Sequence, residues 1–233
     1  MKKCNSERFA IYYAPKHLST LHVLGSHWIG RDASSGAELN QPIVPGVNAT
    51  RLAYLTDSAR HYGFHATLKA PFYLKAGETR QELESTITKT CASLTPFTMQ
   101  LAIKSLDGFF ALMSTSANLK IHELADTLVR ELDIFRSPST RAEIERRRIK
   151  KLNAAQDKNL LRWGYPFVFS EFRFHMTLTS KITCAKEREA LRLAIQSHFL
   201  SALGKDILLD EICLFYQADT RSKFQLAKQF KLG

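Results

Sequence analysis

Two copies of one short pattern most constrain how this chain can fold. The copies are Tyr62-Gly-Phe-His-Ala-Thr-Leu68 and Phe172-Arg-Phe-His-Met-Thr-Leu178, which share aromatic-x-Phe-His-x-Thr-Leu. Each copy precedes a predicted helix and then two predicted strands. The interval from the histidine to the first of those strands is 32 residues in both copies. A repeat of motif, element order and spacing predicts two βαββ halves related by a pseudo-two-fold axis.

The 233 residues suit one domain built from two such halves. We expect an α+β fold that is bilobal, with duplicated βαββ halves whose antiparallel sheets face a central cleft. The first half spans about 8–115 and the second about 170–233. A helical connection over about 116–169 joins them. We expect the segment 15–60 to be largely irregular, with a weak periodicity around Leu18–Ile29 that could be a short helix.

Local signals mark several of the element boundaries. Thr79-x-x-Glu82 and Thr140-x-x-Glu143 have the form of capping boxes, which predict the starts of two helices. Asp107-Gly108 predicts a tight hairpin between two strands.

Side chains alternate between the two faces of a strand, so each copy of the motif has an apolar and a polar face. The polar faces are predicted to carry His65, Thr67 and Lys69 in the first copy and Arg173, His175 and Thr177 in the second. A pseudo-two-fold axis between the strands brings the two imidazoles together.

Two convergent imidazoles suit displacement at phosphorus. A neutral His65 or His175 can accept a proton from the attacking oxygen, and the other, as imidazolium, can protonate the departing oxygen. The hydroxyls of Thr67 and Thr177 can donate to the phosphoryl oxygens. The pattern therefore predicts a phosphodiesterase that needs no metal and no cofactor.

A lone histidine on a strand is usually structural, and the repeat is what favours catalysis here. Zinc is the sharper alternative, because histidine is a common zinc ligand. Two histidines need a further ligand, which Asp32 or Asp57 could supply.

The net charge of +11 favours an anionic partner. Residues 130–162 contain ten basic and five acidic residues, including the run Arg146-Arg-Arg-Ile-Lys-Lys151. RNA is one partner that this run would suit, and a solvated helix face explains it equally well. A small anionic substrate is the other.

Further substrate-binding candidates are weaker. Trp163 and Tyr165 could stack on a base or could be core aromatics. Tyr12 could face the cleft or the core. Arg31 could contact phosphate, although an exposed arginine is more often solvated.

The chain has four cysteines without a Cys-x-x-Cys pair, which fits a reducing compartment. No apolar run approaches the roughly 20 residues that span a bilayer. The start, Met1-Lys2-Lys3, lacks a following signal-peptide core. We therefore expect a cytoplasmic protein without a membrane or an obligate protein partner.

The paired His-x-Thr strands resemble the two-histidine phosphoesterase superfamily. Tyr62-Gly-Phe-His-Ala-Thr-Leu-Lys-Ala-Pro-Phe72, Arg162-Trp-Gly-Tyr-Pro166 and Glu171-Phe-Arg-Phe-His-Met-Thr-Leu-Thr179 are similar to a bacterial branch of it, typically encoded beside carbon–phosphorus lyase genes. The resemblance implies the bilobal fold and places His65, Thr67, His175 and Thr177 at the family's catalytic positions.

The substrate stays open among three classes. The resemblance to the phosphonate-associated branch implies a small ribose-type cyclic phosphate, opened during phosphonate degradation. The alternative is an enzyme acting on RNA ends, as a 2′,3′-cyclic phosphodiesterase or a 2′-5′ RNA ligase-like enzyme. The third is a non-catalytic nucleotide- or RNA-binding module.

Overall fold

The computed structural model describes residues 7–149 and 151–233, so the basic N-terminus, Cys4 and Lys150 lie outside the described residues. Its strands are β1 (Arg8–Tyr13), β2 (Ala66–Tyr73), β3 (Phe97–Met99), β4 (Leu101–Leu106), β5 (Phe109–Ser114), β6 (His175–Thr177), β7 (Ile207–Leu209), β8 (Glu211–Gln217) and β9 (Gln225–Lys231).

The helices fill the intervals between these strands. They are α1 (Thr20–Ile29), α2 (Ala49–Tyr62), α3 (Arg80–Ala92), α4 (Leu119–Glu131), α5 (Arg141–Arg148), α6 (Ala154–Trp163) and α7 (Ala185–Phe199), with short 3-10 helices at Asp133–Phe135 and Phe169–Glu171. None of the described helices is long and apolar enough to cross a membrane.

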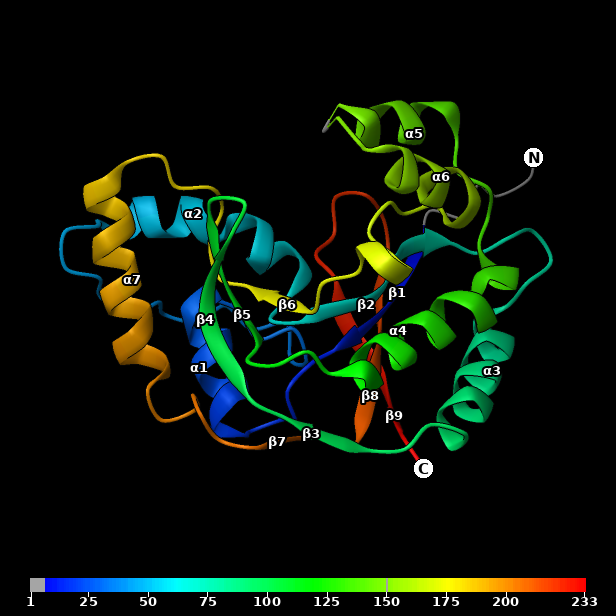
Figure 1. Cartoon of the computed structure of the whole chain (residues 1–233), viewed down its shortest axis with the longest axis horizontal. Coiled ribbons are helices and arrows are strands. Elements are labelled where there is room, and N and C mark those ends of the chain that lie inside the picture. Colours follow the sequence, from blue (N-terminus) through cyan, green and yellow to red (C-terminus); the bar gives the residue numbers. More distant parts are fainter. Residues whose placement is uncertain (1–6, 150) are drawn as a thin grey trace.

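The strands form one seven-stranded sheet in the order β4-β5-β6-β2-β1-β8-β9 and a two-stranded sheet of β3 and β7 (Figure 1). Their pairings are antiparallel, which confirms the α+β class. The two sheets expected on either side of the site are joined into one, because β2 pairs with β6 at Ala66 and Met176.

The pairing of equivalent residues places a local two-fold axis in the molecule. Ala66 pairs with Met176 in the large sheet, and Thr98 pairs with Leu208 in the small one. Both pairs join residues 110 positions apart, which is also the offset between the two copies of the motif. Antiparallel pairing of a strand with its own repeat is what a two-fold axis between them produces.

Pairing also crosses between the two parts of the sequence repeat. The hairpin of β4 and β5, from the first part, joins the sheet beside β6 of the second part. The hairpin of β8 and β9, from the second part, joins beside β1 of the first part. Strand β1 lies between β2 and β8, so the two-fold relation holds at the centre of the sheet and is lost toward its edges.

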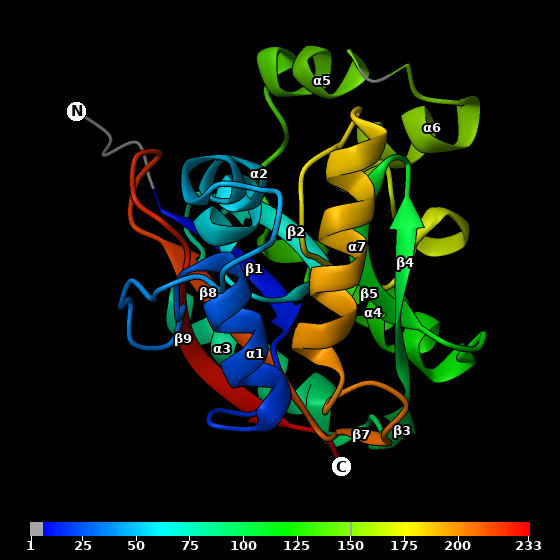
Figure 2. The ribbon, with the colours of Figure 1, turned by 90° about the vertical axis from the view of Figure 1, so that its left-hand side faces the viewer.

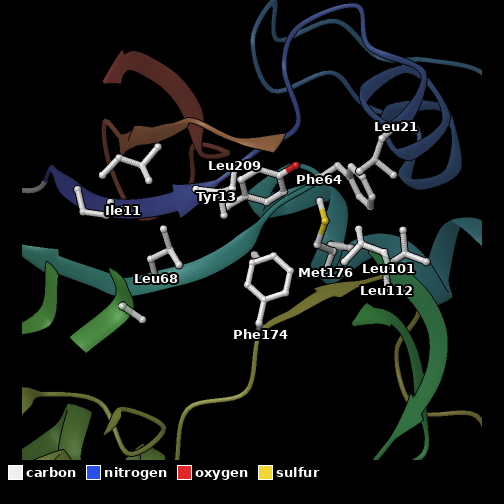
Figure 3. Packing of buried hydrophobic residues seen from close by; sticks show 14 of the residues in the cluster. Ile11, Tyr13, Leu21, Phe64, Leu68, Leu101, Leu112, Phe174, Met176 and Leu209 are labelled. Atoms are coloured by element: carbon white, nitrogen blue, oxygen red, sulfur yellow. The ribbon is translucent and has the colours of Figure 1, made fainter. Parts of the chain in front are cut away.

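One face of the sheet is buried under helices. Figure 3 shows Phe64 and Leu68 from the first motif and Phe174 and Met176 from the second pointing into this core. Buried residues of α1, α2, α3, α4 and α7 belong to the same cluster, and α1 and α7 lie beside one another (Figure 2). The apolar face predicted for each motif is therefore the core face, which leaves the histidines on the opposite side.

The local boundary signals hold where a side chain supplies a cap. Both predicted capping boxes are present, at the starts of α3 and α5. Asp107 and Gly108 have φ values of +47° and +94° between β4 and β5, as a tight hairpin requires.

Helix α2 corrects the expectation of an irregular segment over 15–60. Its start is capped by Asn48, whose side chain accepts a hydrogen bond from the Arg51 backbone. Leu52, Leu55 and Ala59 form its buried stripe. The stripe is narrow and the rest of the helix is polar, so packing rather than propensity stabilises it.

A β-bulge corrects the predicted orientation of Lys69. Ile11 pairs with Lys69, but the next residue, Tyr12, pairs with Thr67, so β2 carries one extra residue, Leu68, at this point. A bulge interrupts the alternation of side chains between faces. Lys69 thus lies on the core face with its partner Ile11.

The Lys69 side chain is accordingly buried, with 4% of its surface exposed. Its Nζ donates to the carbonyl oxygen of Val129 in α4 (3.0 Å) and lies 3.5 Å from a carboxylate oxygen of Asp133. The prediction that Lys69 stands beside His65 on the polar face is wrong.

The pH dependence of stability should report this burial. Burial lowers the pKa of Lys69 from 10.5 to about 8, against the opposing charge of Asp133. The unfolded chain therefore binds more protons between those values, and stability rises with pH through that window. We expect wild type to gain roughly 2 kcal/mol relative to Lys69→Met between about pH 7.5 and about pH 10.

Urea unfolding of both proteins at the two pH values measures this difference. Lys75→Met is the control, because Lys75 is exposed two residues beyond the end of the same strand. A difference that does not change with pH would show that Lys69 titrates as a solvated lysine.

Candidate active site

The four motif side chains form a rectangle at the centre of the sheet. Because Ala66 pairs with Met176, the same register sets Thr67 opposite His175 and His65 opposite Thr177. The two histidines therefore occupy diagonal corners, a relation that separates Cβ atoms by about 7 Å in antiparallel sheets. A group placed over the centre has an imidazole on each side and a hydroxyl at each remaining corner.

Both imidazoles are oriented by equivalent hydrogen bonds. His65 Nδ1 donates to the carbonyl oxygen of Gly63 (2.8 Å), and His175 Nδ1 donates to that of Arg173 (2.7 Å). A carbonyl oxygen can only accept, so Nδ1 carries the proton in each neutral ring and Nε2 keeps its lone pair. The Thr67 hydroxyl lies 3.2 Å from His65 Nε2.

Gly63 is required at its position by the backbone. Its φ is +86° with ψ near 170°, a region that is essentially restricted to glycine. A Cβ at this residue would lie 2.5 Å from that of Ala33. The glycine therefore aims the carbonyl that orients His65.

His65 lies among aromatic rings. The Tyr12 ring stacks on it with centroids 3.9 Å apart, and the rings of Tyr62 and Phe215 lie 6.0 and 6.5 Å away. Burial lowers the pKa of His65 to about 4, the hydrogen bond to Gly63 opposes this, and the charge of His175 adds to it. His65 is therefore neutral at pH 7 and suited to accept a proton.

His175 has a more polar neighbourhood. Burial also lowers its pKa, and the charge of Arg173 acts in the same direction. The carboxylate of Asp107 and the hydrogen bond to the Arg173 carbonyl oppose the shift. The nearest ring contact is Phe109, at 5.9 Å. The two histidines are thus equivalent in backbone geometry and different in electrostatics.

Three of the other predicted substrate-binding residues lie near these histidines. Tyr12 is on the polar face against His65, which resolves whether it faces the site or the core. Tyr165 is half-buried and close enough to Tyr12 to affect its pKa. Arg173 is exposed beside His175.

Two more candidates serve other purposes. Arg31 is buried and donates to the carbonyl oxygens of Arg60 (3.1 Å) and Phe224 (2.7 Å), so it fastens two backbone segments and does not meet substrate. The predicted phosphate contact of Arg31 is wrong. Trp163 packs edge-on against Phe169 (5.1 Å), and its described ring contacts include neither motif histidine.

A family model described as "Protein of unknown function (DUF1045)" matches residues 67–225. The chain belongs to this family. The matched region begins at Thr67 and includes the whole second motif, with His175 and Thr177.

Two curated relatives of the DUF1045 chain carry the same name. "Ribose 1,5-bisphosphate phosphokinase PhnN" of Janthinobacterium sp. (strain Marseille) is 37% identical over 84% of this chain and 44% of the relative. The protein of that name from Laribacter hongkongensis (strain HLHK9) is 32% identical over 95% of this chain and 51% of the relative. The chain spans about half the length of these curated relatives.

Solved structures of similar shape include a phosphoesterase and E. coli LigT complexed with NADP+. The first is 14% identical, with 97% of this chain and 98% of that chain covered and a TM-score of 0.44. The second is 13% identical, with 98% of each chain covered and a TM-score of 0.46. The Phn name of the curated relatives agrees with the phosphonate-associated branch that the sequence motifs resemble.

A group that could hold a cation lies apart from the motif histidines. His17, His22 and Asp32 bring ligand atoms within 4.8 Å of one another, beside a cavity of about 330 Å³. His22 Nε2 lies 3.3 Å from a carboxylate oxygen of Asp32. Asp32 thus joins other histidines and does not complete a zinc site with His65, and Asp57 is an exposed residue of α2.

Two cavities in the described part of this DUF1045 chain do not centre on the motif histidines. One of about 500 Å³ is lined by the loop after α1 and by α2, and the one of about 330 Å³ lies beside Asp32. Neither is lined by His65 or His175. The convergence of side chains, not a deep hollow, identifies the candidate site.

Sequence reasoning passed over Tyr62 and Arg147. Tyr62 was visible as the first aromatic of the motif, and its ring lies 6.0 Å from that of His65. Nothing in the sequence singles out Arg147, because it lies within a run of basic residues. Its guanidinium lies over the ring of Tyr165, 4.9 Å from the centroid.

Nitrogen-15 NMR of the imidazoles should detect both the tautomer and the lowered pKa. We expect His65 and His175 to be Nδ1-protonated in their neutral forms, because each Nδ1 faces a carbonyl oxygen. His65 should titrate with a midpoint near pH 4. Its folded pKa is below the ordinary value of 6.5, so this residue reduces stability as the pH falls from 6.5 toward 4.

Spectra of His65→Gln and His175→Gln assign the two resonances. An Nε2-protonated ring at either position would contradict the orientation described above, and a midpoint near 6.5 for His65 would show that its ring is solvated.

Proposed function

We propose that this protein is a metal-independent cyclic phosphodiesterase that opens a five-membered cyclic phosphate of a small ribose derivative, with His65 as general base and His175 as general acid. The observation that carries the proposal is the rectangle of two histidines and two threonines about the local two-fold axis.

The geometry supports an in-line displacement. A water molecule attacks phosphorus while its proton passes to His65 Nε2, which has a lone pair because Nδ1 donates to Gly63. The bond from phosphorus to one ring oxygen breaks, and His175 Nε2 delivers a proton to that oxygen. The products are a phosphate monoester and a free sugar hydroxyl. The hydroxyls of Thr67 and Thr177 donate to the non-bridging oxygens, where negative charge builds.

The choice of base and acid follows from the surroundings of the rings. The aromatic rings around His65 disfavour its imidazolium form, while Asp107 favours that of His175. Substrate binding adds negative charge between them, which favours the protonated acid. The pair titrates as a coupled unit, so each role is a property of the assembled site.

The ribose class is supported by similarity alone. The curated relatives are named for a reaction of ribose 1,5-bisphosphate, and their Phn name fits the phosphonate-degradation setting of the family that the motifs resemble. A sugar that carries a cyclic phosphate is compatible both with the ribose phosphate in the relatives' name and with phosphodiester cleavage by two histidines.

Turnover of a phosphodiester panel tests the proposal. The EDTA-treated protein is incubated with ribose cyclic phosphates, 2′,3′-cyclic nucleotides and a short RNA ending in a cyclic phosphate, and products are followed by phosphorus NMR. We expect the ribose compounds to be opened best. His65→Ala and His175→Ala should each lower kcat about 10²–10⁴-fold, the range for a lost general acid or base.

His27→Ala is the matched control, because His27 is an exposed histidine of α1. Preference for the RNA would favour an RNA-end enzyme. Activity restored only by zinc would favour a metallohydrolase, and binding without turnover of any compound would favour a non-catalytic module.

The pH profile provides a separate test of the two roles. The productive state has His65 neutral and His175 protonated, so it is most populated between their pKa values. Both pKa values are lowered by burial, that of His65 to about 4. We therefore expect kcat/KM to rise through pH 4, to reach its maximum below pH 6.5 and to fall toward pH 8.

Initial rates over that range, with the same substrate, give the profile. A kcat/KM that keeps rising to pH 8 would contradict a protonated histidine in the free enzyme.

A further inference from the structure

Three consecutive arginines end helix α5, and the structure gives them different surroundings. Arg148 forms a two-pronged ion pair with Asp157, with Nε and NH2 donating at 2.7 and 2.9 Å, which fastens α5 to α6. Arg146 is exposed. Arg147, between them, is half-buried. Both views of the ribbon show α5 and α6 standing together at one end of the molecule, apart from the helices of the core (Figures 1 and 2).

Arg147 is a cation without an anionic partner. Its guanidinium carbon lies 4.9 Å from the centroid of the Tyr165 ring. Its guanidinium forms no hydrogen bond or ion pair within residues 7–149 and 151–233. Glu143, in the same helix, carries a negative charge that raises the pKa of Arg147. Its carboxylate is already bonded in the capping box, where it accepts hydrogen bonds from the backbone and hydroxyl of Thr140.

A guanidinium held this way has unused binding capacity. Its donors are arranged to grip a phosphate or carboxylate with two bonds, and the aromatic ring beneath it fixes its plane. Partial burial disfavours the charged form, as the lowered pKa of Arg147 reflects. An anion at this point would offset that cost.

Arg147 is connected to the strand that follows His65 through its ring partner. Tyr165, under the guanidinium, lines a small cavity together with Lys69 and Ala70 of β2.

Tyr62 and Tyr165 also contribute to the pKa of Arg147. Tyr62 is a neighbour of His65, at 6.0 Å between rings. Tyr165 also contributes to the raised pKa of Tyr12, the residue whose ring stacks on His65. Tyrosine rings therefore lie both under the guanidinium and beside His65.

We propose that Arg147, seated on Tyr165, binds a second phosphate group of the substrate, a monoester carried by the same sugar as the cyclic diester. This assignment rests on the proposed function. The tyrosine rings have the apolar character that suits the face of a sugar ring, and the guanidinium over Tyr165 suits a terminal dianion. The substrate class is thereby narrowed to cyclic phosphates of a phosphorylated pentose.

Kinetics with a matched pair of sugars tests the assignment. Ribose 1,2-cyclic phosphate and its 5-phosphorylated form differ only in the second phosphate. We expect wild type to prefer the phosphorylated sugar in kcat/KM. In Arg147→Gln that preference should fall about 10–100-fold, which corresponds to the free energy of losing hydrogen bonds to a charged group. Arg147→Lys should retain part of it, because lysine keeps the charge and loses the fork.

Arg146→Gln is the matched control, since it removes the same charge from the neighbouring position. It should leave the preference unchanged. An equal loss in the two glutamine variants would overturn the assignment, because it would show a general effect of positive charge. A preference unchanged in Arg147→Gln would overturn it as well, and so would a loss seen only with the cyclic-phosphate RNA. Unfolding curves establish that each variant is folded.

Direct titration separates this assignment from the proposed function. If neither sugar is opened, the proposed function has failed, and calorimetric binding of ribose 5-phosphate still tests Arg147. Binding that is weakened in Arg147→Gln and kept in Arg146→Gln supports the anion site. Equal binding in wild type and Arg147→Gln overturns it.

Discussion

The backbone pairing of Ala66 with Met176 sets the geometry on which the site depends. This contact fixes the register of β2 against β6, and the register alone decides that each histidine stands opposite the threonine of the other motif. A slip of one residue would turn one motif to the core face, because side chains alternate along a strand. The buried contacts of Phe64, Leu68 and Met176 on the other face make such a slip costly. Core packing on one face of the sheet thus fixes the positions of the four polar side chains on the other face.

Equivalent backbone positions nevertheless give the two histidines unequal chemistry. Each ring donates to the carbonyl of the residue two positions earlier, so symmetry supplies the same orientation twice. The difference comes from segments that do not follow the two-fold relation. Strand β1 inserts between β2 and β8 and places Tyr12 against His65, whereas the β4–β5 hairpin presents Asp107 to His175. General acid–base catalysis needs two groups in opposite protonation states, and the asymmetric additions to a symmetric centre supply the means to separate them.

The sequence predicted the centre of the site because the centre depends on regular alternation. His65, Thr67, His175 and Thr177 could be placed on one face from period two alone. Lys69 could not, since the bulge at Leu68 leaves no trace in the pattern of residue types. Arg31 was misplaced for a related reason, because its carbonyl partners come from backbone segments distant in the chain.

Packing between helices decided the rest. Which arginine of the basic run lies over Tyr165 depends on how α5 packs against α6. The ion pair of Arg148 with Asp157 that joins these helices is a tertiary contact. Helix α2 could not be recognised from the sequence, because its exposed face is polar and its buried stripe is narrow. The Asn48 cap marks its start, but short polar side chains of this kind also mark turns.

The pairing of equivalent strands has a consequence for how such a chain could have arisen. Ala66 with Met176 and Thr98 with Leu208 are contacts between a segment and its own repeat, related by a local two-fold axis. Two separate copies of a half-length chain could form both contacts through one self-complementary surface, as subunits of a symmetric dimer do. Its two His-x-Thr motifs would then have been identical and chemically indistinguishable. Joining the copies in one polypeptide frees each histidine to acquire its own neighbours, and the separate acid and base roles proposed for His175 and His65 depend on such differences.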